Sequence, residues 1–168
     1  MARLLSRLTV ALLALVLLAA PAAASGHRFV APLSGDEENP PVDTRATGVA
    51  TFKLNSAGDA FSFRLIVANI ENVTQSHIHC GAEGVNGPVV VFLYPDAPPP
   101  VLIEGRFQGV LATGTRTNAH VIARPDSPEC PGGVANFDEL LAKMRAGEAY
   151  VNVHTQQFPG GEIRGQIR

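Results

Sequence analysis

Two histidines in the segment 76–81, Ser-His-Ile-His-Cys-Gly, are the residues best suited to chemistry. Successive side chains of a strand point to opposite faces, so His77 and His79 would share one face. His154 lies in a second alternating segment near the C-terminus, and pairing of the two segments would bring in a third imidazole. Three histidine ligands with one open position are typical of a catalytic zinc or copper site. One interpretation of the spacing is therefore a copper or zinc site at His77, His79 and His154.

A second interpretation gives the same histidines a structural role, because His-x-His pairs are common. Their imidazoles would make hydrogen bonds that fix loops at one end of the sheet, with Thr155, Asn152 and Asn86 as partners. The sequence carries no Gly-x-Ser-x-Gly elbow and no phosphate-binding glycine loop. Since no catalytic constellation is complete, the sequence favours this structural interpretation and assigns no enzyme activity.

The two cysteines, Cys80 and Cys130, also allow two interpretations. In an exported protein an even pair is typical of a disulfide. Such a bond would close a loop of about 50 residues and stabilise the fold by roughly 4 kcal/mol in the chain-entropy model. Alternatively, Cys80 is a metal ligand beside His79. An oxidising compartment and the lack of another task for Cys130 favour the disulfide.

The N-terminus is typical of a secretory signal peptide over residues 1–24. Arg3 and Arg7 precede an apolar run at 8–20, and small residues follow at 22–24. The run is shorter than a comfortable membrane span. We therefore expect cleavage after residue 24 and a secreted or periplasmic location.

The mature chain, residues 25–168, would be a single domain of 144 residues. It would keep 11 of the 13 basic residues against 15 acidic ones, a net charge of −4. This balance helps solubility and argues against nucleic acid as a partner. No later segment is long and apolar enough to be a transmembrane segment.

Short alternating segments separated by turn residues dominate the mature sequence. A helix is predicted over 137–146, because Asn136 can cap it, Gly147 can end it and apolar residues recur at helical spacing. These features predict an all-β fold, an antiparallel β-sandwich or barrel of an immunoglobulin-like or superoxide-dismutase-like kind, with that one helix. The predicted strands are 28–33, 48–54, 60–67, 75–79, 89–94, 102–111, 149–154 and 162–167.

The segments between and beside these strands are predicted to face solvent. In the last strand, Glu162, Arg164 and Gln166 alternate with inward-pointing apolar residues and should point outward. The acidic loop at 34–42 is predicted to be solvated or to protect a sheet edge. Asn72 begins an Asn-Val-Thr motif, which is an acceptor for N-glycosylation. Whether it is glycosylated depends on the host, which the sequence does not name.

Taken together, these segments resemble the CHRD domain, which is named after the extracellular signalling antagonist chordin and is also found in microbial exported proteins. The resemblance extends over residues 29–167 and implies a β-rich extracellular module with no established reaction. The His-x-His strand is also similar to the copper strand of Cu/Zn superoxide dismutases, although the other ligands of their two-metal site are not found. The segments that carry the CHRD resemblance are 33–42, 48–50, 77–89 and 150–167.

The sequence thus predicts an exported CHRD-like protein that acts as a structural or binding module, with an extracellular protein or a surface ligand as its partner. The alternative is a metal-binding protein in which three histidines hold copper or zinc and support redox chemistry. The two functions differ in one respect that a structure addresses, namely how the three imidazoles lie relative to one another.

Overall fold

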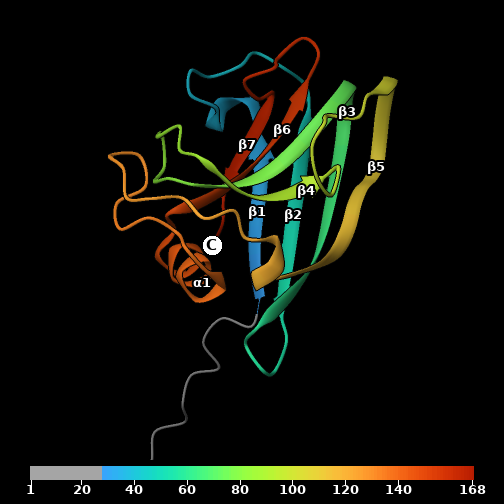
Figure 1. Ribbon diagram of the computed structural model, residues 1–168. Coiled ribbons are helices and arrows are strands. Elements are labelled where there is room, and N and C mark those ends of the chain that lie inside the picture. The colour runs from blue at the N-terminus through green and yellow to red at the C-terminus, as the bar shows by residue number, and fades with distance from the viewer. Residues whose placement is uncertain (1–27) are drawn as a thin grey trace, which may run out of the picture.

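The computed structural model describes residues 28–168, and the predicted signal peptide lies outside this part of the chain. Seven strands form one antiparallel sheet, and the predicted helix is present as α1 (Phe137–Ala146) (Figure 1). No helix among these residues has the length and hydropathy of a membrane-spanning segment. The all-β prediction is confirmed. The strands are β1 (Arg28–Ser34), β2 (Thr47–Leu54), β3 (Ala60–Cys80), β4 (Val89–Tyr94), β5 (Ile103–Thr117), β6 (Ala149–Thr155) and β7 (Ile163–Gln166).

Five of the strands close into a barrel. β2 pairs with β1, β1 with β7, β7 with β6, β6 with β3, and β3 pairs again with β2. The β1–β7 junction continues past β7, where the backbones of Val30 and Arg168 exchange hydrogen bonds of 2.8 and 2.9 Å. β4 and β5 add to β3 outside this ring. Of the two predicted architectures, the barrel is the one formed.

The longest strand, β3, contains two segments that were predicted as separate strands, 60–67 and 75–79. Its first half pairs with β2 and β5, and its second half pairs with β6 and β4. Between the halves, Asn69 and Asn72 adopt positive φ angles of 55° and 53°, and the pairing register shifts. Asparagine tolerates this left-handed conformation, so the strand bends there without ending. The bend interrupts the alternation, which is why the sequence predicted two strands.

The hydrophobic core fills the barrel and extends under α1. Phe61 packs edge-on against Phe52, with ring centres 5.3 Å apart, and stacks on Phe137 of the helix at 5.6 Å. The helix begins as predicted, because Asn136 Oδ1 accepts a hydrogen bond of 3.0 Å from the backbone of Glu139. α1 therefore lies beside the barrel strands, close to the C-terminus (Figure 1).

The predicted disulfide is present between Cys80 and Cys130. Their Cα atoms are 5.4 Å apart and both residues are buried. The bond ties the end of β3 to the segment between β5 and α1. Because both sulfurs are used, Cys80 is not a metal ligand, and the disulfide interpretation is the correct one.

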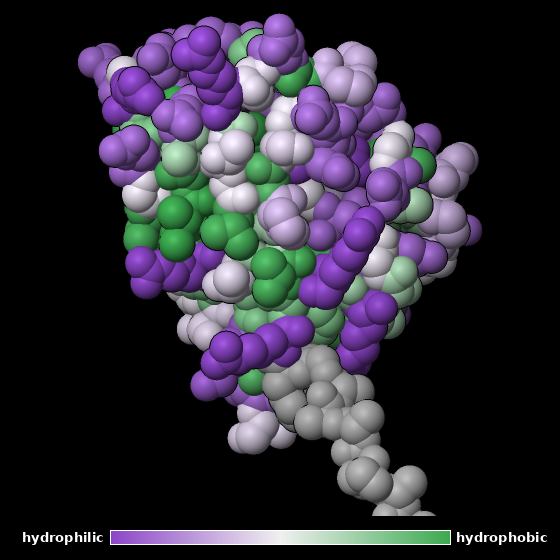
Figure 2. Space-filling model, turned by 180° about the vertical axis from the view of Figure 1, so that it is seen from behind, coloured by the Kyte–Doolittle hydropathy of each residue, from purple (hydrophilic) through white to green (hydrophobic). Residues whose placement is uncertain are grey.

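The outer face of the sheet away from the C-terminal strands is partly apolar. Pro32, Val49, Ile66 and Val110 lie directly opposite one another across β1, β2, β3 and β5. Val110 is 41 % exposed. Figure 2 shows apolar residues gathered into a patch on the side opposite to the view of Figure 1. The outward face of β3, β6 and β7 differs, because polar side chains line it and loops cover it.

Candidate metal centre

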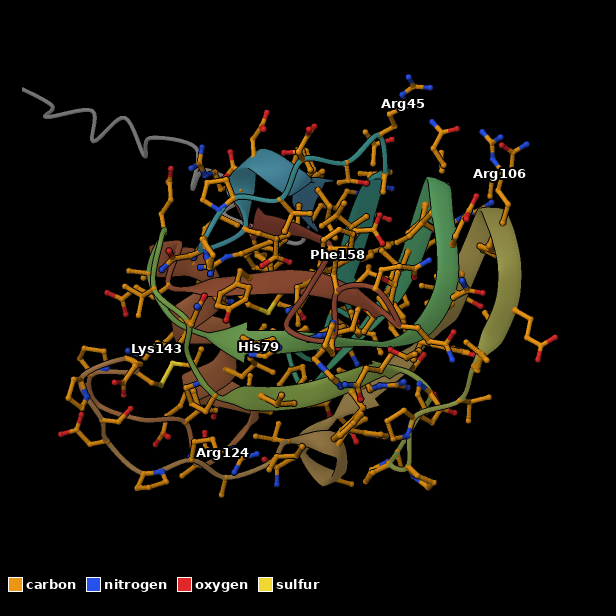
Figure 3. All side chains as sticks on the ribbon, turned by 90° about the horizontal axis from the view of Figure 1, so that it is seen from above. Arg45, His79, Arg106, Arg124, Lys143 and Phe158 are labelled. Atoms are coloured by element: carbon orange, nitrogen blue, oxygen red, sulfur yellow. A yellow bond between two sulfur atoms is a disulfide. The ribbon has the colours of Figure 1, made fainter. Side chains whose placement is uncertain are left out.

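The three predicted histidines converge. β3 carries His77 and His79, and β6 carries His154, which lies opposite Gln75 in the β3–β6 ladder. The ring centres of His77 and His154 are 5.0 Å apart, and those of His77 and His79 are 5.5 Å apart. One ring nitrogen from each residue lies within 4.8 Å of the other two. We call this cluster the three-histidine site; Figure 3 shows His79 inside the molecule, with Arg45 and Arg106 at its periphery.

The site is enclosed by aromatic rings. The three imidazoles are only 3 to 8 % exposed. Phe92 of β4 packs edge-on against His77 at 4.6 Å, and Tyr150 of β6 stacks almost parallel on His79 at 4.8 Å. These rings exclude water from two faces of the site and hold the imidazoles in place.

Backbone carbonyls fix the tautomers of two imidazoles. Nδ1 of His79 lies 2.8 Å from the carbonyl oxygen of Gly87, and Nδ1 of His154 lies 3.0 Å from that of Pro159. A carbonyl oxygen only accepts, so each Nδ1 carries the hydrogen and each Nε2 carries a lone pair. A hydrogen bond from one ring nitrogen to a carbonyl, with the other left free, is the usual arrangement of a metal-bound histidine.

His77 completes the site through a hydrogen bond to another imidazole. Its Nδ1 lies 3.2 Å from Nε2 of His154. Because that Nε2 accepts, His77 Nδ1 donates, and His77 Nε2 carries the lone pair. An ion bound here would take the place of this hydrogen bond.

Burial keeps the three imidazoles uncharged. It lowers the pKa of His77 to about 3 and that of His79 to about 4, and it lowers the pKa of His154 below its ordinary value. The neighbouring imidazoles lower the pKa of His77 further. At neutral pH the site therefore consists of three neutral nitrogen ligands, which need not release protons to bind a metal ion.

A layer of buried polar side chains surrounds the site, and here the sequence prediction is wrong. Glu162, Arg164 and Gln166 were expected to face solvent, yet they are 6, 1 and 6 % exposed. They do point away from the barrel interior, but the loop between β3 and β4 contacts Arg164 and Gln166, and Thr44 of the segment before β2 bonds to Glu162. Arg164 donates to the carbonyls of Ala82 and Val85 at 3.1 and 2.9 Å. Strand alternation gives the direction of a side chain but not what a distant loop lays over it.

Two further residues of this layer are buried, one expected beside the histidines and one expected in solvent. Asn152, opposite His77 in the β3–β6 ladder, is 2 % exposed. Glu38, from the acidic loop that was expected to be solvated, is 8 % exposed, and burial raises its pKa to about 7. The Glu38 carboxylate packs against Gly161 in the β6–β7 turn. No sequence signal separates Glu38 from its exposed neighbours Asp36 and Glu37, because the contact joins residues far apart in the chain.

The loop-fixing hydrogen bonds of the structural interpretation exist in part. His79 and His154 do bond to loops, through the carbonyls of Gly87 and Pro159. Of the three expected side-chain partners, Asn152 does interact with His79. The other two act elsewhere: Asn86 accepts from Arg164, and Thr155 accepts from the backbone of Phe158. These loop bonds use the Nδ1 atoms of His79 and His154, and they leave the Nε2 atoms of His77 and His79 without a partner.

Comparison with known proteins yields one finding. A family model described as the CHRD domain matches residues 29–167. Comparisons with the curated proteins and with the solved structures gave no match. The matched region contains six whole strands and all of β1 except its first residue, together with the three-histidine site and both cysteines. The chain therefore belongs to the CHRD domain family.

Proposed function

We propose that this chain is an exported CHRD-domain module that binds one copper or zinc ion through His77, His79 and His154. The observation that carries the proposal is the convergence of three buried, neutral imidazoles whose ring nitrogens lie within 4.8 Å of one another. Neutral imidazole nitrogen suits both of these metals. With three protein ligands, a bound ion would keep a coordination position open.

Export is supported by the disulfide and by the N-terminal sequence. Disulfides persist in oxidising compartments and are rare in the cytosol. We further propose that the domain acts outside the cytoplasm and meets an extracellular protein or a surface ligand there. Redox chemistry would follow if the ion is copper.

The rival function is a purely structural one. The bonds from His79 to Gly87 and from His154 to Pro159 favour it, because they would anchor two loops without any ion. It leaves unexplained the buried Nε2 atoms of His77 and His79, which have no hydrogen-bond partner.

Metal analysis of four proteins separates the two functions. The wild type and the variants His77→Ala, His154→Ala and His120→Ala would be stripped with a chelator, reloaded with Zn(II) or Cu(I), and desalted. His120 is exposed on the short helix Asn118–His120, so it serves as a matched control. We expect one equivalent of metal in the wild type and in His120→Ala, and an affinity lowered by about 100-fold or more in the other two.

Equal, sub-stoichiometric metal in all four proteins would contradict metal binding and leave the structural role. Near-ultraviolet circular dichroism of the stripped proteins checks that the variants are folded, so that a loss of metal reports on the ligands.

A further inference from the structure

Four buried side-chain atoms within residues 28–168 have no hydrogen-bond partner. They are Glu38 Oε1, His77 Nε2, His79 Nε2 and Asn152 Oδ1. All belong to the three-histidine site or to the polar layer beside it. Unpaired buried polar atoms are rare in folded proteins, so a group of four in one place indicates a missing partner.

The other polar side chains of this layer are already paired. Tyr150 Oη accepts from the backbone of Gly87 at 3.2 Å, and Glu162 Oε1 accepts from Thr44 at 2.7 Å. Gln166 donates to two backbone carbonyls, at 2.8 and 2.7 Å. The unpaired atoms are therefore confined to the two histidines of β3, Asn152 and Glu38.

The four unpaired atoms lie along one path. Asn152 stands opposite His77, and its amide is close enough to His79 to stabilise the protonated form of that imidazole. Gly161 connects Asn152 to Glu38, because a Cβ atom at position 161 would overlap Glu38 Oε1 and lie 3.0 Å from Asn152 Nδ2. Glu38 and Asn152 thus both lie against the same glycine, and Asn152 links it to His77 and His79.

With Glu38 ionised, all four atoms are electron-pair acceptors, so in that state they cannot satisfy one another. The two nitrogens carry lone pairs, as the tautomers above require, and the other two atoms are oxygens. A metal ion would satisfy the nitrogens. A water molecule bound to that ion has two hydrogens to donate, one for Asn152 Oδ1 and one for Glu38 Oε1.

We propose that the ion of the three-histidine site carries one water molecule whose hydrogens are accepted by Asn152 Oδ1 and Glu38 Oε1. This inference rests on the proposed metal site and names the ligand at its open position. That ligand is a protic oxygen, namely water, hydroxide or the hydroxyl group of a substrate. Aprotic anions are disfavoured there, because they offer no hydrogen to either acceptor.

Glu38 is then the group that takes the proton of the bound water. If the ion ionised that water, the electron pair of the broken O–H bond would stay on the oxygen, and the Glu38 carboxylate would accept the proton. In the metal-free protein, burial raises the pKa of Glu38 to about 7.

Cobalt substitution with azide as the probe tests this arrangement. The wild type, Glu38→Gln and Glu37→Gln would be loaded with Co(II), whose visible spectrum reports its ligands, and titrated with azide. Glu37 is the exposed neighbour of Glu38 and gives a matched control. We expect azide to bind the wild type and Glu37→Gln weakly, and Glu38→Gln at least about tenfold more tightly, because a negative acceptor no longer repels the anion. Asn152→Ala should show a smaller rise in the same direction.

The possible results are distinguishable. If Co(II) does not bind, or binds His77→Ala equally well, the proposed metal site fails. If Co(II) binds through the histidines but azide binds all three proteins alike, the site stands and the water inference is overturned. Should Glu38→Gln not fold, Glu38→Asp replaces it; a shortened carboxylate should also tighten azide binding relative to Glu37→Gln, and unchanged binding would again overturn the inference.

Discussion

Burial of ionisable side chains decides the chemistry of individual residues here. The three histidines and Glu38 all lie beneath loops, and burial shifts each toward its neutral form. Neutral imidazole is the metal-binding form, so the burial that keeps the histidines uncharged also leaves them in the form that the proposed metal site requires. The lowered pKa values of the histidines make the fold less stable in acid, whereas the raised pKa of Glu38 makes it less stable in alkali.

Acid should destabilise the metal-free protein through the histidines. The pKa values of His77 and His79 fall to about 3 and about 4 in the folded state from an ordinary value of 6.5. The unfolded chain therefore binds more protons below pH 6.5, and the stabilising contribution, complete above that pH, is lost as the pH falls. Urea unfolding with chelator present should show a loss on the order of 3 kcal/mol between pH 6.5 and 4.5. His77→Gln should flatten this slope and His120→Gln should not; equal slopes in all three proteins would contradict the prediction.

Alkali should destabilise the protein through Glu38. Its pKa rises to about 7 from an ordinary value of 4.5, so its contribution is complete below pH 4.5 and is lost as the pH rises through 7. We expect Glu38→Gln to unfold with the same free energy as the wild type at pH 4 and to be more stable by about 1–2 kcal/mol at pH 8. Chemical denaturation at the two pH values measures this. Glu37→Gln serves as the exposed control, and a stability difference independent of pH would contradict the assignment.

At the scale of elements, two loops convert an outward strand face into a buried layer. The β3–β4 loop is held by Arg164 and by His79, and the β6–β7 turn is held by His154. The loop backbone approaches β3 so closely at Gly87 that a Cβ atom there would overlap the carbonyl oxygen of Cys80. The glycine at 87 is therefore required by packing.

Gly87→Ala should lift the loop from β3 and carry away the carbonyl that fixes His79. We expect a loss of about 2–4 kcal/mol in the free energy of unfolding and a metal affinity lowered about 10- to 100-fold. Gly160→Ala is the control, because a Cβ atom at 160 has no neighbour within 4 Å and the residue has no positive φ. Thermal unfolding and metal titration test both variants. Equal behaviour of the two would mean that the loop adapts freely.

At the scale of the whole molecule, one covalent link joins the barrel to the segment before α1. The disulfide between Cys80 and Cys130 spans 50 residues that include β4 and β5. It begins at the residue after His79, so it also anchors the strand end that carries two of the three histidines. Together with α1 packing on Phe61, it holds the non-barrel half of the chain against the barrel.

Removal of this disulfide should lower the free energy of unfolding more than any single surface substitution would. For a loop of this length the chain-entropy model gives about 4 kcal/mol. We expect the double variant Cys80→Ser, Cys130→Ser to lose that amount in guanidinium unfolding and to bind metal more weakly, because the end of β3 is no longer tethered. A reduced wild type should match the double variant. Unchanged stability in both would show that barrel closure alone holds the fold.

Local patterns in the chain were enough to predict most of the secondary structure and the pairing of the cysteines. Alternation predicted most strands to within a few residues, and cap residues predicted the ends of α1, because these features depend on neighbours along the chain. His77 and His79 share a face for the same reason. The three-dimensional packing was needed to show that His154 meets them, that Glu38 and Arg164 are buried, and that the sheet closes into a barrel. Those outcomes depend on strand register and on loops that fold back from distant positions, and no local pattern encodes such contacts.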